Sequence, residues 1–286
     1  MANLKEIRGR ITSISSTMQI TSAMKMVSAA KLKKAQDAIV MLRPYSEKLQ
    51  EIIQNVNANP DPDNISPYAA SREVKRVLFI VVTSNRGLAG AFNSSVIKEL
   101  NNRLTDINAE TEVLTIGKKA FDGLRKTKKV FENHSEVFDA LNFDNVSKAT
   151  LSVMKQFREG KFDKVFIIYN KFINAATQEV VTEQVLPIAM PENTNSGANT
   201  DYIFEPNAKE ILDNLIPKSI KTQVFKAVLD SVAAEHGARM TAMHKATDNA
   251  QALKNDLVIF YNKARQAAIT NEILEIVGGA EALKNG

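Results

Sequence analysis

The stretch that decides the fold is residues 225–274, FKAVLDSVAAEHGARMTAMHKATDNAQALKNDLVIFYNKARQAAITNEIL. Steps of alternately three and four residues define one face of this stretch that is almost entirely apolar. The face comprises Phe225, Leu229, Val232, His236, Arg239, Met243, Ala246, Ala250, Leu253, Leu257, Phe260, Ala264, Ala267, Asn271 and Leu274. Only His236, Arg239 and Asn271 are polar. An apolar repeat of about 3.5 residues held this long predicts a coiled-coil helix, whose seam must be covered by another helix.

The other end of the chain supplies the partner helix. Residues 3–56 carry the same spacing, at Leu4, Ile7, Ile11, Ile14, Met18, Thr21, Lys25, Ser28, Leu32, Ala35, Ile39, Leu42, Ser46, Leu49, Ile53 and Val56. We expect Pro44 to bend this helix, because it removes a backbone donor and crowds the preceding turn. At about 1.5 Å per residue the two helices reach roughly 80 and 115 Å. Such lengths favour an antiparallel coiled coil over two amphipathic helices on an ordinary core.

The level at which the helices face each other follows from where they part, near Val56 and Ala208. Numbers of facing residues then sum to about 264 if both helices are regular. This register puts Leu4 near Phe260 and leaves everything after Tyr261 without a partner helix.

Both seams become polar at one level in this register. Thr21, Lys25 and Ser28 face Met243, Arg239 and His236, respectively. Two like charges such as Lys25 and Arg239 do not share a dry seam without a counter-charge. We therefore expect the coiled coil to loosen there, or an acidic group from another chain to enter.

Composition excludes several classes of protein. The 286 residues are 44% hydrophobic and 24% charged, which is typical of a folded chain with room for two domains. Absence of cysteine excludes a disulfide scaffold and a thiol nucleophile. No run of eighteen apolar residues occurs, and the first residues lack the apolar core of a signal peptide, so we expect neither a membrane span nor export by that route.

Positive charge is concentrated at the start of the chain. Up to Lys34 there are seven basic residues and one acid, Glu6. A solvated charged face is the ordinary meaning of such a cluster. Docking on an acidic protein surface is the stronger functional interpretation, because the helix lacks the aromatic residues and docking motifs of nucleic-acid binders.

The middle of the chain alternates between strand and helix patterns. We predict strands at 77–82, 112–116, 164–169 and 179–186, and helices at 94–108, 118–125 and 146–158. We further predict a linker at residues 57–67, a loop at 191–200 and a last edge strand at 202–204. The fold class is therefore α/β: a long antiparallel α-helical coiled coil (1–56 and 207–286) with an inserted Rossmann-like α/β domain (57–206).

Motifs for catalysis and cofactor binding are missing. The turn at 84–90, SNRGLAG, does not satisfy the G-x-G-x-x-G spacing, and Gly117-Lys118 is followed by Lys119 where a phosphate loop needs Ser or Thr. Glycines in such a turn more often serve backbone geometry. His236 and His244 have no carboxylate at ligand spacing, so we expect no metal, no cofactor and no catalytic residue. The sequence therefore favours a mechanical or binding role over a catalytic one.

Five stretches carry a family resemblance: KEIRGRITSISSTMQITSAMKMVSAAKLKKAQ (5–36), SNRGLAGAFN (84–93), IIYNKFIN (167–174), MTAMHKATDNA (240–250) and YNKARQAAITNEILEIVGGAEAL (261–283). They closely resemble the γ subunits of F-type ATP synthases over nearly the whole chain. The resemblance implies a non-catalytic rotor, present once, whose coiled coil stands inside a ring of three α and three β subunits. It also implies an α/β domain at the foot, beside the ε subunit and the membrane c-ring.

Partner-contact residues follow from the resemblance by matching positions. The family's contacts with an acidic loop of the β subunit fall on Met24, Lys25 and Arg239, with Lys31, Lys33 and Lys34 available nearby. Its upper contacts with the ring fall on Arg265, Gln266, Thr270 and Glu272. The resemblance further implies a peripheral membrane protein on the cytoplasmic face of a bacterial plasma membrane, without direct membrane insertion and without nucleic acid.

Two positions depart from the family pattern. The turn usually reads Asp-Arg-Gly-Leu-Cys-Gly, whereas this chain has Asn85 and Ala89. Contacts of that turn that depend on charge are therefore in doubt. The remaining alternatives are a basic coiled-coil scaffold that binds nucleic acid, and a nucleotide-dependent α/β enzyme that carries a helical hairpin.

The unpartnered end of the second helix yields the first test. Residues 262–283 carry apolar side chains on more than one face, so they need a sleeve made by other subunits. We predict rapid amide exchange there in the free chain and protection in the assembled complex, measured by mass spectrometry. Equal exchange rates in the two states would contradict this.

Overall fold

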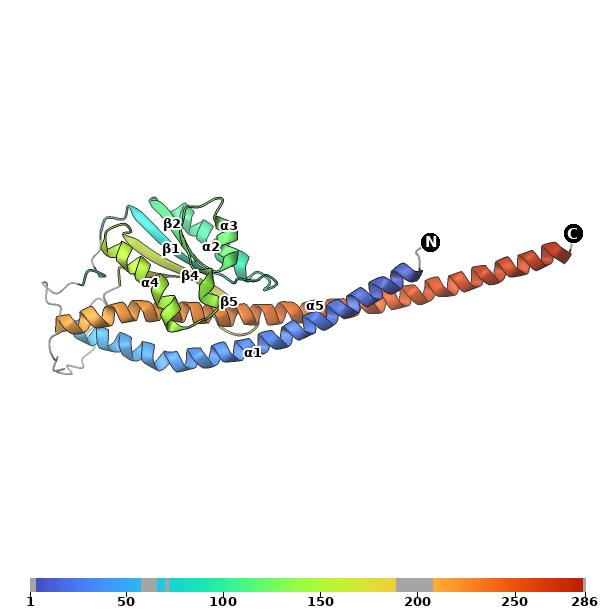
Figure 1. The fold of residues 1–286 in the computed structure, drawn as a ribbon, viewed down its shortest axis with the longest axis horizontal. Helices are drawn as coiled ribbons and strands as arrows, with labels where there is room; N and C mark the ends of the chain where they lie inside the picture. The colour runs from blue at the N-terminus through green and yellow to red at the C-terminus, as the bar shows by residue number, and fades with distance from the viewer. Residues whose placement is uncertain (1–3, 58–65, 70–71, 189–207, 285–286) are drawn as a thin grey trace. The chain divides into compact units, whose positions relative to one another are not determined.

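Two long helices and a five-stranded sheet make up the structure, a computed structural model that describes residues 4–57, 66–69, 72–188 and 208–284 (Figure 1). The long helices are α1 (Leu4–Asn57) and α5 (Ala208–Lys284). The strands are β1 (Arg76–Val82), β2 (Glu110–Ile116), β3 (Val130–Asn133), β4 (Lys164–Phe172) and β5 (Gln178–Leu186). The shorter helices are α2 (Phe92–Asp106), α3 (Lys118–Leu124), the 3-10 turn η2 (Ser135–Phe138) and α4 (Phe143–Arg158).

The chain divides into two compact units. One comprises Met1–Val27 and Met240–Gly286, and the other is Ser28–Arg239. Each long helix therefore contributes to both units. The division into 1–56, 57–206 and 207–286 follows chain connectivity instead and stays a prediction.

The sheet of the second unit has the strand order β3-β2-β1-β4-β5. Strands β1 to β4 are parallel, and β5 is an antiparallel edge strand paired with β4. Six of the seven residues of β1, VLFIVV, are buried on both faces. Continuous apolar runs of this kind are typical of central parallel strands that are covered by helices on both sides. The Rossmann-like prediction is confirmed.

Helices cover the two faces of this sheet differently. On one face, Val77, Phe79 and Val81 of β1 pack with α2 and α3. On the other face, the sheet packs with α4 and with one stripe of α5. The α5 stripe consists of Leu212, Ile216, Ile220, Val224, Ala227 and Val228. The first part of α5 is thus a core helix of the α/β domain.

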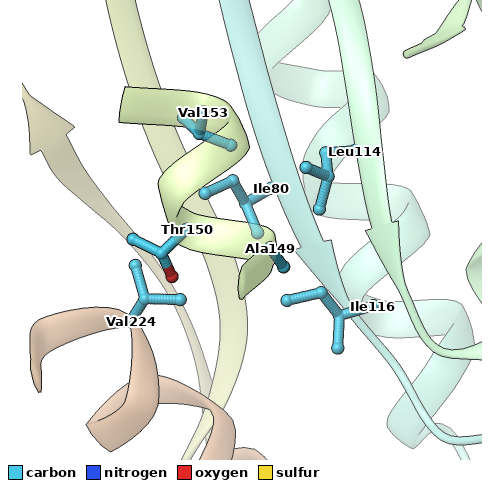
Figure 2. A pocket seen from close by; sticks show the side chains of 7 residues that line it. All are labelled: Ile80, Leu114, Ile116, Ala149, Thr150, Val153 and Val224. Atoms are coloured by element: carbon cyan, nitrogen blue, oxygen red, sulfur yellow. The ribbon is translucent and has the colours of Figure 1, made fainter. Parts of the chain in front are cut away.

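A small apolar gap lies where the sheet, α4 and α5 meet (Figure 2). Its lining is Ile80, Leu114, Ile116, Ala149, Thr150, Val153 and Val224. The Thr150 hydroxyl donates to the Val146 carbonyl of its own helix at 2.9 Å, so it offers no donor to a ligand. The gap has no room for a water-sized molecule and belongs to the core.

The seven central elements predicted from the sequence are all present, with bounds shifted by at most three residues. The short strand β3 and the turn η2 were missed. β3 has four residues, and its inner neighbour β2 pairs with it across a register shift. A strand this short and half exposed lacks the apolar run that identifies a buried strand. The predicted loop at 191–200 and edge strand at 202–204 lie outside the described residues.

The first unit is an antiparallel pair of helices. On α1, all seven predicted seam positions from Leu4 to Lys25 are at least partly covered, which confirms that seam. Three contacts fix the pairing: Arg8 Nη2 donates to the Tyr261 hydroxyl at 2.7 Å, the hydroxyls of Thr21 and Thr247 bond at 2.8 Å, and Lys25 Nζ donates to His244 Nδ1 at 3.2 Å.

The predicted register of this pair is wrong by about one helical turn. Paired residue numbers sum to 268 or 269 in these contacts, whereas the prediction was about 264. The partner of Lys25 is His244, and Tyr261 faces Arg8. Sliding one helix along the other by about a turn still brings apolar faces together, so the seam pattern alone does not fix the register.

On α5 the predicted seam also changes phase. Leu253 and Phe260 were placed in it, but they are 51% and 50% exposed. Lys254 and Tyr261, one residue further along, are more covered. An α-helix has about 3.6 residues per turn, so a frame drawn at 3.5 drifts over several turns. Residues 265–283 are exposed at every position, so the unpartnered end begins at Arg265.

The turn between β2 and α3 provides a stability test. Gly117 has φ +117°, and a Cβ there would clash with the Thr83 carbonyl group. We expect Gly117→Ala to destabilise the chain by about 2 kcal/mol or more, from backbone strain and the clash. Chemical denaturation followed by circular dichroism measures this.

Gly9→Ala is the matched control, because Gly9 lies in α1 with open space around its Cα. Alanine should stabilise that helix by about 0.5–1 kcal/mol. If Gly117→Ala leaves the unfolding free energy unchanged, Gly117 does not lie as close to the Thr83 carbonyl group as described.

Candidate functional site

The predicted contact residues on α1 fall in both units. Met24 and Lys25 are half-buried in the helix pair, where Lys25 bonds to His244. Lys31, Lys33 and Lys34 are exposed in the second unit. Lys33 forms an ion pair with Asp37 at 2.8 Å, one helical turn away. Because that pair is solvated, it contributes little stability and leaves the positive face available for an acidic partner.

The upper contact residues all lie on the exposed end of α5. Arg265, Gln266, Thr270 and Glu272 are exposed, and the Thr270 hydroxyl donates to the Gln266 carbonyl at 2.9 Å. Large apolar side chains surround them on the same segment: Ile269, Ile273, Leu274, Ile276 and Val277, between 48% and 67% exposed. Mixed polar and apolar exposure on one helix is typical of a surface that another protein covers.

Arg239 has a different environment from the other cations. Arg239 is only 8% exposed. Its Nη1 donates to Glu235 Oε1 at 2.6 Å and approaches His236 Nδ1 at 3.5 Å, while Nη2 donates to the carbonyls of Arg86 and Gly87 at 3.1 and 3.2 Å. The guanidinium therefore joins α5 to the turn that follows β1.

We expected a loosened coiled coil or an acidic group from another chain at the level of Arg239, but its counter-charge comes from within the chain. Glu235, four residues earlier on α5, forms a buried ion pair with it. A carboxylate at this spacing faces its cation on the same side of a helix. The Glu235–Arg239 pair is therefore visible in the sequence as an i,i+4 spacing, whereas the coiled-coil seam relates only residues on facing helices.

Two loops of the α/β domain hold α5, and together we call them the α5 clamp: the turn after β1 (83–91) and the end of β4 with the hairpin that follows (172–177). Ala89, Phe92 and Phe172 pack with Ala234 of α5. Gly237 lies so close to the hairpin that a Cβ would meet the Ala175 backbone at 3.3 Å.

The clamp occupies the position where sheets of this topology commonly bind ligands. In a doubly wound sheet, the crevice outside the carboxyl ends of the strands, where the strand order reverses, is the usual site. Here that point lies between β1 and β4, and α5 residues pack against the loops that follow both strands. The domain uses this crevice to hold its own helix.

Hydrogen bonds fix the turn of the clamp. Ser84 donates its backbone N–H to Asn93 Oδ1 at 2.9 Å and its hydroxyl to the Arg86 carbonyl at 2.6 Å. The Thr83 hydroxyl accepts from the Ala120 N–H at 2.8 Å. Of the two glycines, only Gly90 has positive φ, and the other left-handed residue is Leu88, at φ 63°. Gly90 therefore serves backbone geometry as expected, whereas for Gly87 that interpretation stays a prediction.

Asn85, one of the two departures from the family pattern, has a specific role in this turn. Its Nδ2 donates to the Ser135 carbonyl and its Oδ1 accepts from the Lys118 N–H, both at 2.9 Å. An aspartate could accept the second bond but could not donate the first. The amide therefore ties β1, α3 and η2 together without adding charge.

Burial changes the titration of two α5 residues beside Arg239. Burial raises the pKa of Glu235, and the nearby Arg239 opposes that rise. Burial, together with the charges of Arg239 and Lys31, lowers the pKa of His236 to about 4. His236 is therefore neutral near pH 7, which suits its Nδ1 to accept from Arg239.

Within the described ranges, no group of three or more histidine and acidic residues is arranged to hold a metal ion. None of the described helices combines the length and apolarity that a membrane span requires.

His236 gives a pH test with a definite sign. The folded-state pKa of His236 is about 4, below the unfolded value of 6.5. The stability of the fold that depends on neutral His236 is therefore complete above pH 6.5 and is lost as the pH falls toward 4. We expect the unfolding free energy of His236→Gln to fall less steeply between pH 6.5 and pH 4. The slope changes by less than about 1.4 kcal/mol per pH unit, because the ring is partly exposed. Denaturation at several pH values measures the slope. His244→Gln, an exposed neighbour on α5, is the control, and an equal effect of both variants would contradict the burial argument.

Comparison with known proteins agrees with this architecture. A family described as ATP synthase matches residues 3–283. An ATP synthase gamma chain of Flavobacterium johnsoniae is 61% identical over 285 residues and covers 99% of both chains, and one of Cytophaga hutchinsonii is 49% identical with 100% of both covered.

Solved structures share the fold. The rotor of the Euglena gracilis mitochondrial ATP synthase has a TM-score of 0.66 at 21% identity, covering 93% of this chain and 98% of that one. The central stalk of the Tetrahymena thermophila enzyme has a TM-score of 0.61 at 23% identity, covering 79% and 99%. The long helices and the inserted α/β domain are thus a fold shared with these structures, and by its family match and its relatives the chain belongs to the gamma-chain family of ATP synthases.

Proposed function

We propose that this chain is the central-stalk rotor of a bacterial F-type ATP synthase and couples proton flow through the membrane sector to conformational change in the catalytic β subunits. Its membership of the gamma-chain family is the observation that carries the proposal. Catalysis belongs to the β subunits, and the chain itself is a non-catalytic subunit. Its contribution is mechanical.

Asymmetry is what allows a shaft to do this work. The clamped domain lies on one side of α5, and the exposed residues of the two long helices differ from face to face. As the shaft turns, each β subunit meets a different surface. Because β conformations that bind the shaft differently have different free energies, rotation and nucleotide binding become coupled equilibria.

The exposed end of α5 fits a bearing formed by the α and β subunits. Residues 265–283 have no covering helix in the described structure. Surrounding α and β subunits that remove their apolar side chains from water would stabilise the assembly. Arg265, Gln266, Thr270 and Glu272 supply polar contacts to that sleeve.

A lower contact lies near the basic part of α1. Lys25, Lys31, Lys33 and Lys34 present positive charge to an acidic loop of β, with the uncharged Met24 beside Lys25, and charge complementarity favours such a pairing. Arg239 lies beneath the surface and acts through the turn that it holds. The α/β domain faces the ε subunit and the c-ring, which makes the chain a peripheral membrane protein on the cytoplasmic face, present once per complex.

Direct observation of rotation tests the proposal. The chain has no cysteine, so Lys126→Cys, in an exposed segment after α3, gives one attachment point for a bead or fluorophore. With the complex fixed through its β subunits, we expect ATP to drive the label in one direction with three pauses per turn, one for each β subunit. A label on an α subunit is the control and should stay still. Steady ATP hydrolysis with a motionless γ label would refute the rotor function.

A further inference from the structure

The α5 clamp depends on one buried cation. Arg239 contacts an acid on its own helix and two carbonyls of the turn after β1. The planar guanidinium directs separate N–H groups to these partners, a geometry that a lysine ammonium on a flexible stem does not reproduce. Bonds from a charged donor in a buried site are also stronger than neutral ones.

The turn after β1 needs stabilising contacts, because its backbone adopts a disfavoured conformation at Leu88. Leu88 adopts positive φ although it is not glycine, and its side chain is 65% exposed. Ala89, the next residue, is buried against Ala234. The Arg86 carbonyl accepts from both the Ser84 hydroxyl and Arg239. The turn therefore has a fixed underside on α5 and an exposed outer side.

We propose that Arg239 is a positioning residue that fastens the turn after β1 to residues 234–239 of α5, so that the turn and this part of α5 move together during rotation. This inference rests on the proposed rotor function. It assigns the Arg239 guanidinium to contacts within the chain, in place of a direct contact with a carboxylate of a passing subunit. Glu235 completes the arrangement by compensating the buried charge.

Amide exchange in the assembled complex tests the fastening. Arg239→Gln removes the charge and the fork of donors, and we expect amides of residues 84–93 to exchange about ten- to a hundredfold faster, the effect of losing one or two charge-assisted bonds. Lys245→Gln, an exposed residue on the same helix, should leave this exchange unchanged. Unchanged exchange in Arg239→Gln would overturn the proposal.

A cross-link then separates positioning from direct contact. In the cysteine-free chain, Ala89→Cys and Ala234→Cys place two thiols in one buried cluster. We expect Arg239→Gln to lower the number of protons pumped per ATP hydrolysed. Joining the two introduced thiols, by oxidation or with a short bis-thiol reagent, should restore that number. Loss of pumping that this cross-link does not restore would mean that Arg239 acts on a partner directly.

The remaining outcomes are also decisive. If the cross-link does not form, the packing of the turn on α5 is not as described and the proposal fails. If Arg239→Gln prevents assembly, Arg239→Lys, which keeps the charge but not the fork, is subjected to the same two measurements. Pumping by complexes that lack this chain would refute the rotor function itself, whereas normal pumping by Arg239→Gln alone would refute only the fastening.

Discussion

A helix of 77 residues with an apolar seam must have that seam covered, and the rest of the structure follows from how α5 meets this requirement. Its first part is buried in the core of the α/β domain, where Ile216, Ile220 and Val224 pack against the sheet. Its next part pairs with α1. Its last part has no covering helix in the described structure. One helix is thus in turn a core helix of the α/β domain, one member of a helix pair and an exposed segment.

The clamp explains why a sheet with a nucleotide-binding topology serves a mechanical part. In this topology the crevice between β1 and β4 is the natural ligand site, and here α5 is packed against its loops by Ala234, Gly237 and Arg239. Gly237 permits the close approach, because a Cβ there would lie 3.3 Å from the Ala175 backbone, a contact tighter than most. The same loops that position a ligand in other proteins therefore position a shaft.

Features that depend on local periodicity could be predicted from the sequence. The α1 seam, the buried strand β1 and the order of central elements all follow from repeats of apolar residues. The register of the helix pair could not be predicted, since displacement by a turn preserves the apolar match, and the edge strand β3, with only four residues, was not predicted either. The Glu235–Arg239 pair was readable from i,i+4 spacing. By contrast, the double hydrogen bond of Asn85 depends on η2, which lies about fifty residues away and has no local signal.

Fastening by Arg239 requires that the α/β domain and residues 224–239 of α5 move together, and one measurement examines this requirement directly. Cryo-electron microscopy of the assembled complex during turnover separates its rotational states, and the domain can be superposed on α5 residues 224–239 in each. We predict that the turn at 83–91 keeps the same contacts with Ala234 and Arg239 in every state, while the β subunits change around it. A domain that shifts on α5 from one rotational state to the next would contradict it.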